Sequence, residues 1–200
     1  MPHKIFTSLF GLILAVGCSD GHSNMDNVNS EANCETGYTE QASSLYNLPY
    51  AKGEAYTVGQ GNCTDGSHLT GSEQAYAYDF DMPIGTDIVA AREGSVEVVV
   101  EQFTDGNNIA GRENYIIIQH GDGSISGYYH LTFEGALVEV GDFVEQGDVI
   151  GKSGNTGDSS APHLHFEVAQ CQDCQTLPTN FKNTRSHTHG LEEGEAYIAE

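Results

Sequence analysis

The sequence contains few basic residues, with 7 lysines and arginines against 29 aspartates and glutamates and a formal net charge of -22 over 200 residues. Nucleic-acid binding needs clustered basic side chains that contact phosphates, and their scarcity disfavours nucleic acid as a partner. The acid excess is typical of a solvated surface and suits a salty medium in which screening weakens self-repulsion.

Long helical patterns and solenoid-type repeats are also missing. The 24 glycines, together with short segments rich in Val, Ile and Tyr, predict a turn-rich β protein. Two such segments joined by Gly121-Asp122-Gly123 predict a β-hairpin over residues 114–130. The length suits one domain with appendages. We therefore expect a domain over residues 46–185 and an acidic C-terminal tail over residues 186–200.

No apolar run is long enough to remain as a membrane-spanning helix. The run over residues 5–17 follows a single lysine and is typical of an export signal. It leads to Ala15-Val16-Gly17-Cys18, which resembles a bacterial lipobox, in which the cysteine is lipidated. We expect a signal peptide over residues 1–17, then lipidated Cys18 and a flexible tether over residues 18–45. An ordinary signal peptide cleaved nearby is the alternative.

These features predict an exported protein of the cell envelope, in the periplasm or at the outer membrane, whose only membrane contact is the lipid on Cys18. Four further cysteines remain, an even number, which in an exported protein favours disulfides over free thiols or metal ligands. Three pairings are open, and we prefer Cys34–Cys63 with Cys171–Cys174. The Cys-x-x-Cys pair lacks the second pair of a zinc knuckle and the βαβ context of a thioredoxin-like redox motif.

An aspartate lies inside an aromatic strand, where carboxylates are unusual. Asp79 stands between Tyr78 and Phe80. A buried carboxylate needs a partner, so Asp79 is either hydrogen-bonded within the structure or bound to a cation. The sequence pattern at this position leaves both alternatives open.

Two pairs of histidines have the spacing His-x-His. His163 and His165 lie in a short apolar segment after a loop rich in glycine and serine. Side chains alternate faces along a strand, so the two rings project together, and one can bind zinc while the other handles a proton. By itself the triplet is a weak signal. His187 and His189 repeat the spacing among Ser, Thr and Gly, and we expect them to be exposed loop residues.

Five motifs occur together in the order typical of one family. They are Tyr78-Asp79-Phe80, Pro83-x-Gly85-Thr86, Tyr129-His130-Leu131, Val140-Gly141-Asp142-x-Val144-x-x-Gly147-x-x-Ile150-Gly151 and Gly154-Asn155-Thr156-Gly157-x-x-x-x-Pro162-His163-Leu164-His165-Phe166-Glu167. With these motifs the chain, from about residue 46 to residue 168, resembles the lysostaphin-type (LytM-like) zinc metalloendopeptidases. The resemblance implies a compact all-β domain, a β-sandwich or barrel-like core of duplicated hybrid-motif type, with the site in a groove.

In that family a histidine, an aspartate and the second histidine of His-x-His hold one zinc ion, which here implies Asp79 and His165. The first histidine usually lies four residues before the aspartate, where this chain has Ala75. Some members with a Tyr-Ala-x-Asp-Phe strand take it from a Ser-His pair further upstream, and His68, which follows a serine, fits that variant. We therefore expect His68 as the third ligand, with His120 as the substitute.

Two imidazoles and one carboxylate leave the open position that a catalytic zinc site requires. A metal of this kind lowers the pKa of water toward about 7 and polarises the scissile carbonyl. His163 is then the candidate general base, and His130 the candidate residue that positions water or stabilises the oxyanion. Glu167, on the same strand face as His165, is a candidate support for that ligand.

The expected activity is hydrolysis of peptide bonds in the cross-links or stem peptides of bacterial peptidoglycan, by a monomer with one zinc ion per chain. One alternative is a non-catalytic LytM-like regulator that activates other cell-wall hydrolases, although retention of the metal-site and catalytic residues argues against it. A lipoyl or biotinyl carrier is another, but no lysine stands in a matching hairpin turn.

Overall fold

Ten strands and two short 3₁₀ helices form the secondary structure of the computed structural model, which describes residues 34–200. All of these strands pair in antiparallel fashion, so the predicted all-β fold is confirmed. The elements are η1 (Gln41–Ser43), β1 (Ala55–Gln60), η2 (Gly66–His68), β2 (Tyr78–Asp81), β3 (Asp87–Val89), β4 (Gly94–Val100), β5 (Asn114–Gln119), β6 (Ile125–Ala136), β7 (Phe143–Val144), β8 (Val149–Ser153), β9 (His163–Ala169) and β10 (Ala196–Ile198).

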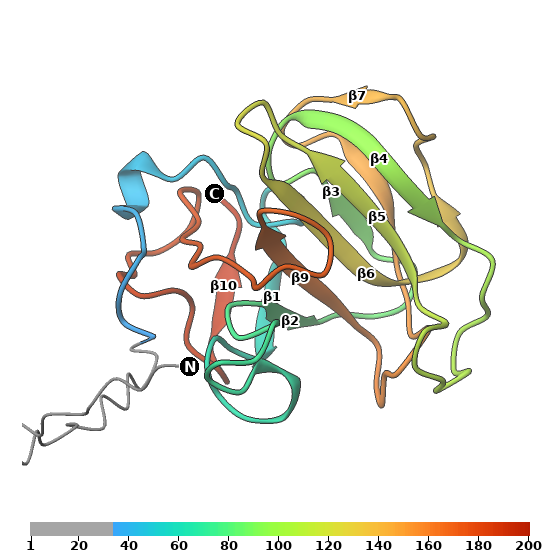
Figure 1. Cartoon of the computed structure of the whole chain (residues 1–200), viewed down its shortest axis with the longest axis horizontal. Coiled ribbons are helices and arrows are strands. Elements are labelled where there is room, and N and C mark those ends of the chain that lie inside the picture. The colour runs from blue at the N-terminus through green and yellow to red at the C-terminus, as the bar shows by residue number, and fades with distance from the viewer. Residues whose placement is uncertain (1–33) are drawn as a thin grey trace, which may run out of the picture.

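The strands follow the order β10-β1-β2-β9-β6-β5-β4-β7, with β3 paired to β8 off this path (Figure 1). The 12-residue strand β6 connects the parts of the sheet because it pairs with three strands. The first half of β6 lies between β5 and β9, and the second half pairs with β8. The predicted hairpin over residues 114–130 corresponds to β5 and the start of β6 and is confirmed.

Apolar side chains on one face of the central strands form the main core. Tyr78 and Phe80 of β2, Leu164 and Phe166 of β9 and Tyr128 of β6 are fully buried there. Burial of each large apolar side chain contributes roughly 1.5–3 kcal/mol. Because side chains alternate along a strand, the polar residues between these core residues point to the opposite face. The core therefore decides which side of the sheet carries the histidines.

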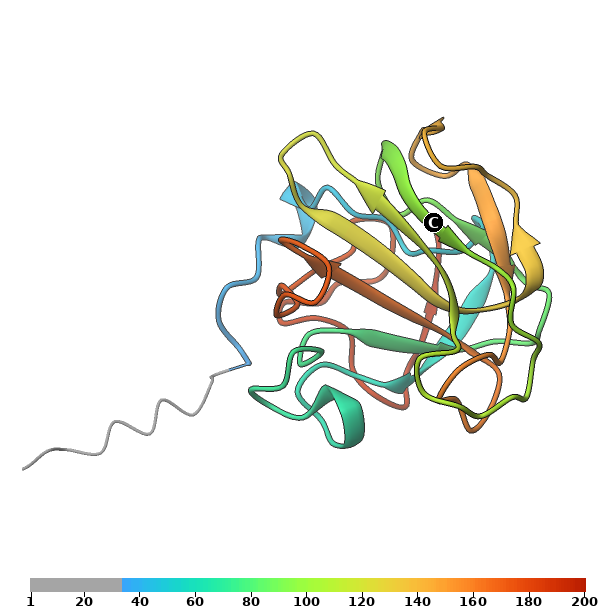
Figure 2. The same cartoon turned by 45° about the vertical axis from the view of Figure 1, so that its right-hand side comes forward.

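The N-terminal and C-terminal segments of the described chain both contact the rest of the domain. The C-terminal strand β10 pairs with β1, and its Tyr197 is buried, so the end of the acidic segment 186–200 lies against the sheet (Figure 2). On the N-terminal side the buried Ser44 hydroxyl donates a hydrogen bond to the carbonyl oxygen of Asn180 at 2.5 Å. The domain boundaries at residues 46 and 185 stay predictions.

The preferred pairing of the four cysteines, Cys34–Cys63 with Cys171–Cys174, is confirmed. The predicted signal peptide and Cys18 lie outside the described residues. Among residues 34–200, none of the helices is long or apolar enough to cross a membrane.

Candidate metal centre

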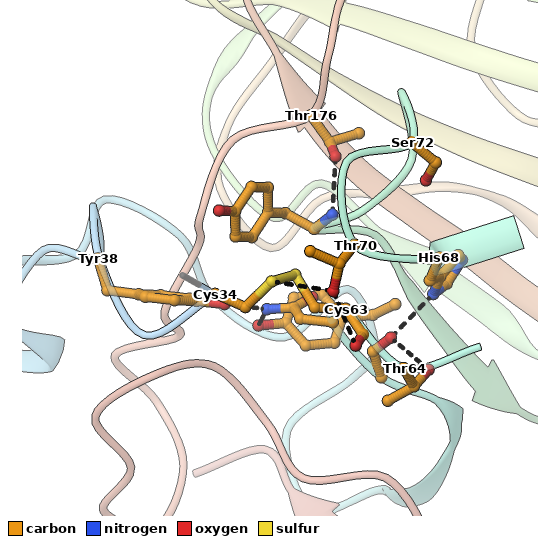
Figure 3. The surroundings of a disulfide bond; sticks show 12 residues. Cys34, Tyr38, Cys63, Thr64, His68, Thr70, Ser72 and Thr176 are labelled. Carbon is orange, nitrogen blue, oxygen red and sulfur yellow. Dashed lines mark hydrogen bonds between the residues drawn. A yellow bond between two sulfur atoms is a disulfide. The ribbon is translucent and has the colours of Figure 1, made fainter. Parts of the chain in front are cut away.

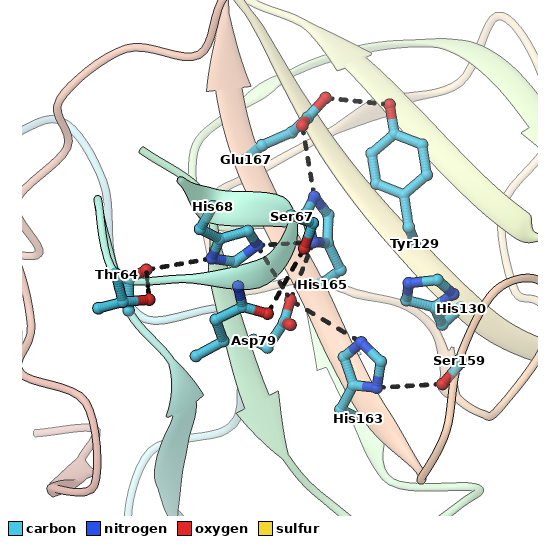
Figure 4. Close-up of polar contacts among 12 residues, drawn as sticks. Thr64, Ser67, His68, Asp79, Tyr129, His130, Ser159, His163, His165 and Glu167 are labelled. Atoms are coloured by element: carbon cyan, nitrogen blue, oxygen red, sulfur yellow. Dashed lines mark hydrogen bonds and ion pairs between the residues drawn. The ribbon is translucent and has the colours of Figure 1, made fainter. Parts of the chain in front are cut away.

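Three neighbouring strands carry the site on the face opposite the core. Asp79 of β2 stands directly opposite His165 of β9, and His165 stands opposite Tyr129 of β6. Side chains opposed in this way have Cβ atoms about 4.5–5.5 Å apart. Strand pairing alone therefore brings Asp79 and His165 into contact, and Asp79 Oδ1 lies 2.9 Å from His165 Nδ1 (Figure 4).

The third predicted ligand, His68, arrives from a loop upstream of β2. It ends the short helix η2 and its side chain is fully buried. The disulfide Cys34–Cys63 ties this loop to the N-terminal segment (Figure 3). The backbone N–H of Cys63 also donates to the carbonyl oxygen of Ala75 at 2.7 Å. These bonds hold the loop against the start of β2, where Asp79 lies.

The donor atoms of the three predicted ligands form a small triangle. His68 Nε2 lies 3.5 Å from Asp79 Oδ1 and 3.4 Å from His165 Nδ1, which completes a set able to hold one metal ion. Ligands bound about 2.0–2.1 Å from a tetrahedral ion are about 3.3 Å apart, so the spacing fits. The other ring nitrogens are already engaged, since His68 Nδ1 lies 3.1 Å from the carbonyl oxygen of Gly61 and His165 Nε2 lies 3.4 Å from Glu167 Oε2.

The carboxylates of Asp79 and Glu167 hold a positive charge at this site. Burial alone raises the pKa of Asp79, but the hydrogen bond from His165 and the charges of His165, His163 and His68 outweigh it and lower the pKa to about 2. Burial alone lowers the pKa of His165, but Asp79 and Glu167 outweigh it and raise the pKa to about 10. Burial lowers the pKa of His68. In the absence of a metal, the site therefore keeps a proton on His165.

His163 lies beside the ligands without belonging to the triangle. Its Nδ1 lies 2.8 Å from the carbonyl oxygen of Ala161 and 3.2 Å from the hydroxyl of Ser159. A carbonyl oxygen only accepts hydrogen bonds, so Nδ1 carries the proton of the neutral ring. Nε2 is then an acceptor, and it lies 3.8 Å from Asp79 Oδ1.

A β-bulge in β6 turns the His130 side chain toward the site. Its neighbours Tyr129 and Leu131 pair with consecutive residues of β5, so His130 is an extra, bulged residue. Its φ of 64° lies in the left-handed region, which is rare for residues other than glycine. Regular alternation would place His130 on the face opposite Tyr129, whereas the bulge brings its ring centroid within 4.5 Å of that of His163.

A buried hydrogen-bond network holds His130 in this position. Its Nδ1–H donates to the carbonyl oxygen of Thr156 at 2.6 Å, and the Thr156 hydroxyl accepts from the backbone N–H of Asn114. Burial, together with the His163 and His165 rings, lowers the pKa of His130 to about 3. The neutral ring presents Nε2 as an acceptor, which suits orienting a water molecule better than donating to an oxyanion.

The substitute ligand, His120, lies in different surroundings. It is buried at the turn between β5 and β6, with its ring nitrogens 2.8 Å from the carbonyl oxygen of Glu93 and 3.1 Å from the hydroxyl of Ser126. The triangle of metal donors contains His68 and not His120. We therefore assign His120 a structural role.

The second His-x-His pair, His187 and His189, is exposed at only one of its two residues. His189 is exposed, as predicted, but His187 is half-buried, so the prediction of an exposed residue is wrong for it. Its Nε2 accepts from the backbone N–H of Phe181 at 3.1 Å, and its Nδ1–H donates to the carbonyl oxygen of Arg185. These bonds occupy both ring nitrogens and make His187 part of the loop structure.

Tyr129 is a site residue that sequence reasoning missed. Its hydroxyl donates to Glu167 Oε1 at 3.1 Å. Burial, followed by the charge of Glu167, raises the pKa of Tyr129 well above its usual value, so the phenol stays protonated. Its place in the Tyr129-His130-Leu131 motif was the only sequence signal.

The site opens into a groove of about 460 Å³ whose lining includes His130, His163 and His165. Against known families, residues 73–178 match Peptidase family M23. The chain belongs to peptidase family M23. The expected family is therefore confirmed, and His68 lies upstream of the segment that the M23 match covers.

The chain is also similar in sequence to curated proteins with known names. The chain is 44% identical over 90 residues to peptidoglycan DD-endopeptidase ShyA of Vibrio cholerae, covering 45% of this chain and 19% of ShyA. It is 37% identical over 130 residues to lysostaphin of Staphylococcus simulans, covering 64% of this chain and 23% of lysostaphin. The chain thus spans about a fifth of the length of these curated relatives.

A solved M23 structure has the same fold. The deep-sea M23 metalloprotease pseudoalterin superposes with a TM-score of 0.54 at 19% identity, over 79% of this chain and 96% of pseudoalterin. At this level of identity the likeness concerns the fold alone.

The first prediction concerns the third ligand. We expect about one metal ion per wild-type chain and none in His68→Ala, because two remaining donors hold an ion poorly. Elemental analysis of the purified proteins measures this directly. His120→Ala removes another buried histidine and serves as the matched control, which should keep its metal. Metal retained by His68→Ala, or lost from His120→Ala, would contradict the assignment.

The second prediction concerns pH. The metal must displace the proton that Asp79 and Glu167 keep on His165, whereas His68, with its lowered pKa, is already neutral. Metal affinity should therefore fall as the pH falls, by about tenfold per pH unit between about pH 8 and 7. Competition with a chromophoric chelator at several pH values measures it, and an affinity independent of pH in this range would contradict the argument.

Proposed function

We propose that this chain is a zinc peptidase that hydrolyses peptide bonds in bacterial peptidoglycan. The observation that carries the proposal is the placement of two further histidines, His163 and His130, beside a three-ligand cluster that opens into a groove. Membership of peptidase family M23 supports peptidase chemistry. The similarity to ShyA, a peptidoglycan DD-endopeptidase, supports the substrate.

Zinc is the metal that this donor set suits best. Two imidazoles and one carboxylate, here His68, His165 and Asp79, are typical ligands of a catalytic zinc, and three protein ligands leave one position open. When bound, zinc acts as a Lewis acid that acidifies water and polarises a carbonyl group. The proton transfers remain the work of the side chains around it.

His163 is the proposed general base. With Nδ1–H bonded to Ala161, its Nε2 is the atom that accepts a proton from the attacking water. The same nitrogen then returns the proton to the amine that leaves when the C–N bond breaks, so no proton is gained or lost. Neutral His130, held by Thr156, orients the water through its own Nε2.

We also propose that the chain is exported to the cell envelope and anchored by a lipid on Cys18. The support is the short apolar run over residues 5–17 and the lipobox-like residues that end at Cys18. Two disulfides suit an oxidising compartment. Export brings a cell-wall hydrolase to its substrate. A purely regulatory role has less support, because the ligands and both further histidines are present together.

The third prediction tests catalysis. His163→Ala should slow the digestion of purified peptidoglycan by about 10²–10⁴-fold, because the general base is lost, and His130→Ala should slow it as well. Release of new amino groups measures the rate, and elemental analysis should show that both variants keep their metal.

His189→Ala, a change at an exposed histidine outside the site, should digest peptidoglycan at the wild-type rate. Zinc-loaded wild-type protein that releases no amino groups would reject the proposed function. A wild-type rate in His163→Ala would reject only the assignment of the base.

A further inference from the structure

The two histidine ligands have different partners at their second ring nitrogen. His68 Nδ1 lies 3.1 Å from the carbonyl oxygen of Gly61, which is a neutral acceptor. His165 Nε2 lies 3.4 Å from Glu167 Oε2, which belongs to a carboxylate. A carboxylate at this place fixes the ring orientation and makes the imidazole a stronger ligand. His165 is thus the ligand that the surrounding side chains tune.

Glu167 is itself held in place by Tyr129. The Tyr129 hydroxyl donates to Glu167 Oε1 at 3.1 Å, so the two carboxylate oxygens have separate partners (Figure 4). The Tyr129 ring stacks on Tyr115 with centroids 5.2 Å apart and meets the His165 ring edge to face at 5.5 Å. The Glu167 side chain is only 12% exposed. Packing and hydrogen bonds therefore limit the positions that the carboxylate can take.

A glycine makes room for this arrangement. Gly127 stands opposite Glu167 in the pairing of β6 with β9, two pairs away from Tyr129 and His165. A Cβ atom on Gly127 would lie 2.5 Å from a carbon of the Tyr129 ring. Its φ is not in the left-handed region, so its backbone does not require glycine. The absence of a side chain is what lets the Tyr129 ring lie over Gly127 and reach Glu167.

We propose that Glu167 and Tyr129, seated by Gly127, are positioning residues for the metal ligand His165. Glu167 accepts the Nε2–H bond, which leaves Nδ1 as the nitrogen that faces Asp79 and the metal. Tyr129 keeps the carboxylate oriented toward the ring. This inference rests on the metal centre proposed above, and its test is metal binding in the absence of any substrate.

The experiment is a chelator competition that measures the affinity for Zn²⁺ at fixed pH. Glu167→Ala should bind Zn²⁺ about 10–100-fold more weakly than the wild type, because His165 loses its partner. Glu167→Gln should recover much of that loss, since an amide oxygen still accepts the Nε2–H bond. Tyr129→Phe and Gly127→Ala should each weaken binding, because both leave Glu167 unsupported.

Glu113→Gln is the matched control, because it neutralises another carboxylate of the same groove that lies outside the ligand contacts. Its Zn²⁺ affinity should equal that of the wild type. A second readout is the ¹⁵N spectrum of His165 in the zinc-loaded protein. The wild type should show one form, protonated at Nε2, and Glu167→Ala should show that form lost or mixed with the other.

Wild-type affinity in Glu167→Ala would overturn this inference while leaving the proposed function intact. An equal loss in Glu167→Gln and Glu167→Ala would also overturn it, because Glu167 would then act through its charge alone and not by positioning the His165 ring. A wild-type protein that binds no Zn²⁺ would overturn the proposed function and this inference together.

Discussion

The pairing of β9 between β2 and β6 is the constraint on which the rest of the site depends. It sets Asp79, His165 and Tyr129 side by side across three strands. The same register buries the alternate residues Leu164 and Phe166 in the core. A slip of one residue would turn the histidines of β9 into the core and the core residues into the groove. The free energy of apolar burial thus also fixes two of the metal ligands, Asp79 and His165.

Much of the site follows from local sequence patterns. Alternation along a strand was enough to predict that His163 and His165 share a face, and an aspartate among aromatics marked Asp79. Positions that depend on tertiary contacts were harder to predict from the sequence. His68 was placed only through the resemblance to a family, because a loop histidine carries no periodic signal, and its loop is held by long-range bonds such as the disulfide Cys34–Cys63.

His130 shows why alternation has limits. The face of the sheet on which the His130 side chain lies depends on a β-bulge. Nothing in the motif Tyr129-His130-Leu131 predicts this bulge or its φ of 64°. Backbone strain of this kind costs about 1–3 kcal/mol, and the Thr156 and Asn114 bonds help to hold it. The roles of Gly127 and Tyr129 were hidden for a similar reason, since each depends on a neighbour in another part of the fold.

The most direct test of this account is X-ray absorption at the zinc edge of the zinc-loaded protein. We expect a first shell of two imidazole nitrogens and one carboxylate oxygen about 2.0–2.2 Å from the ion, with one further light atom. The same spectrum from His68→Ala should lose one imidazole or contain no zinc signal at all. Sulfur in the first shell, or a wild-type spectrum unchanged in His68→Ala, would contradict the metal centre formed by His68, Asp79 and His165.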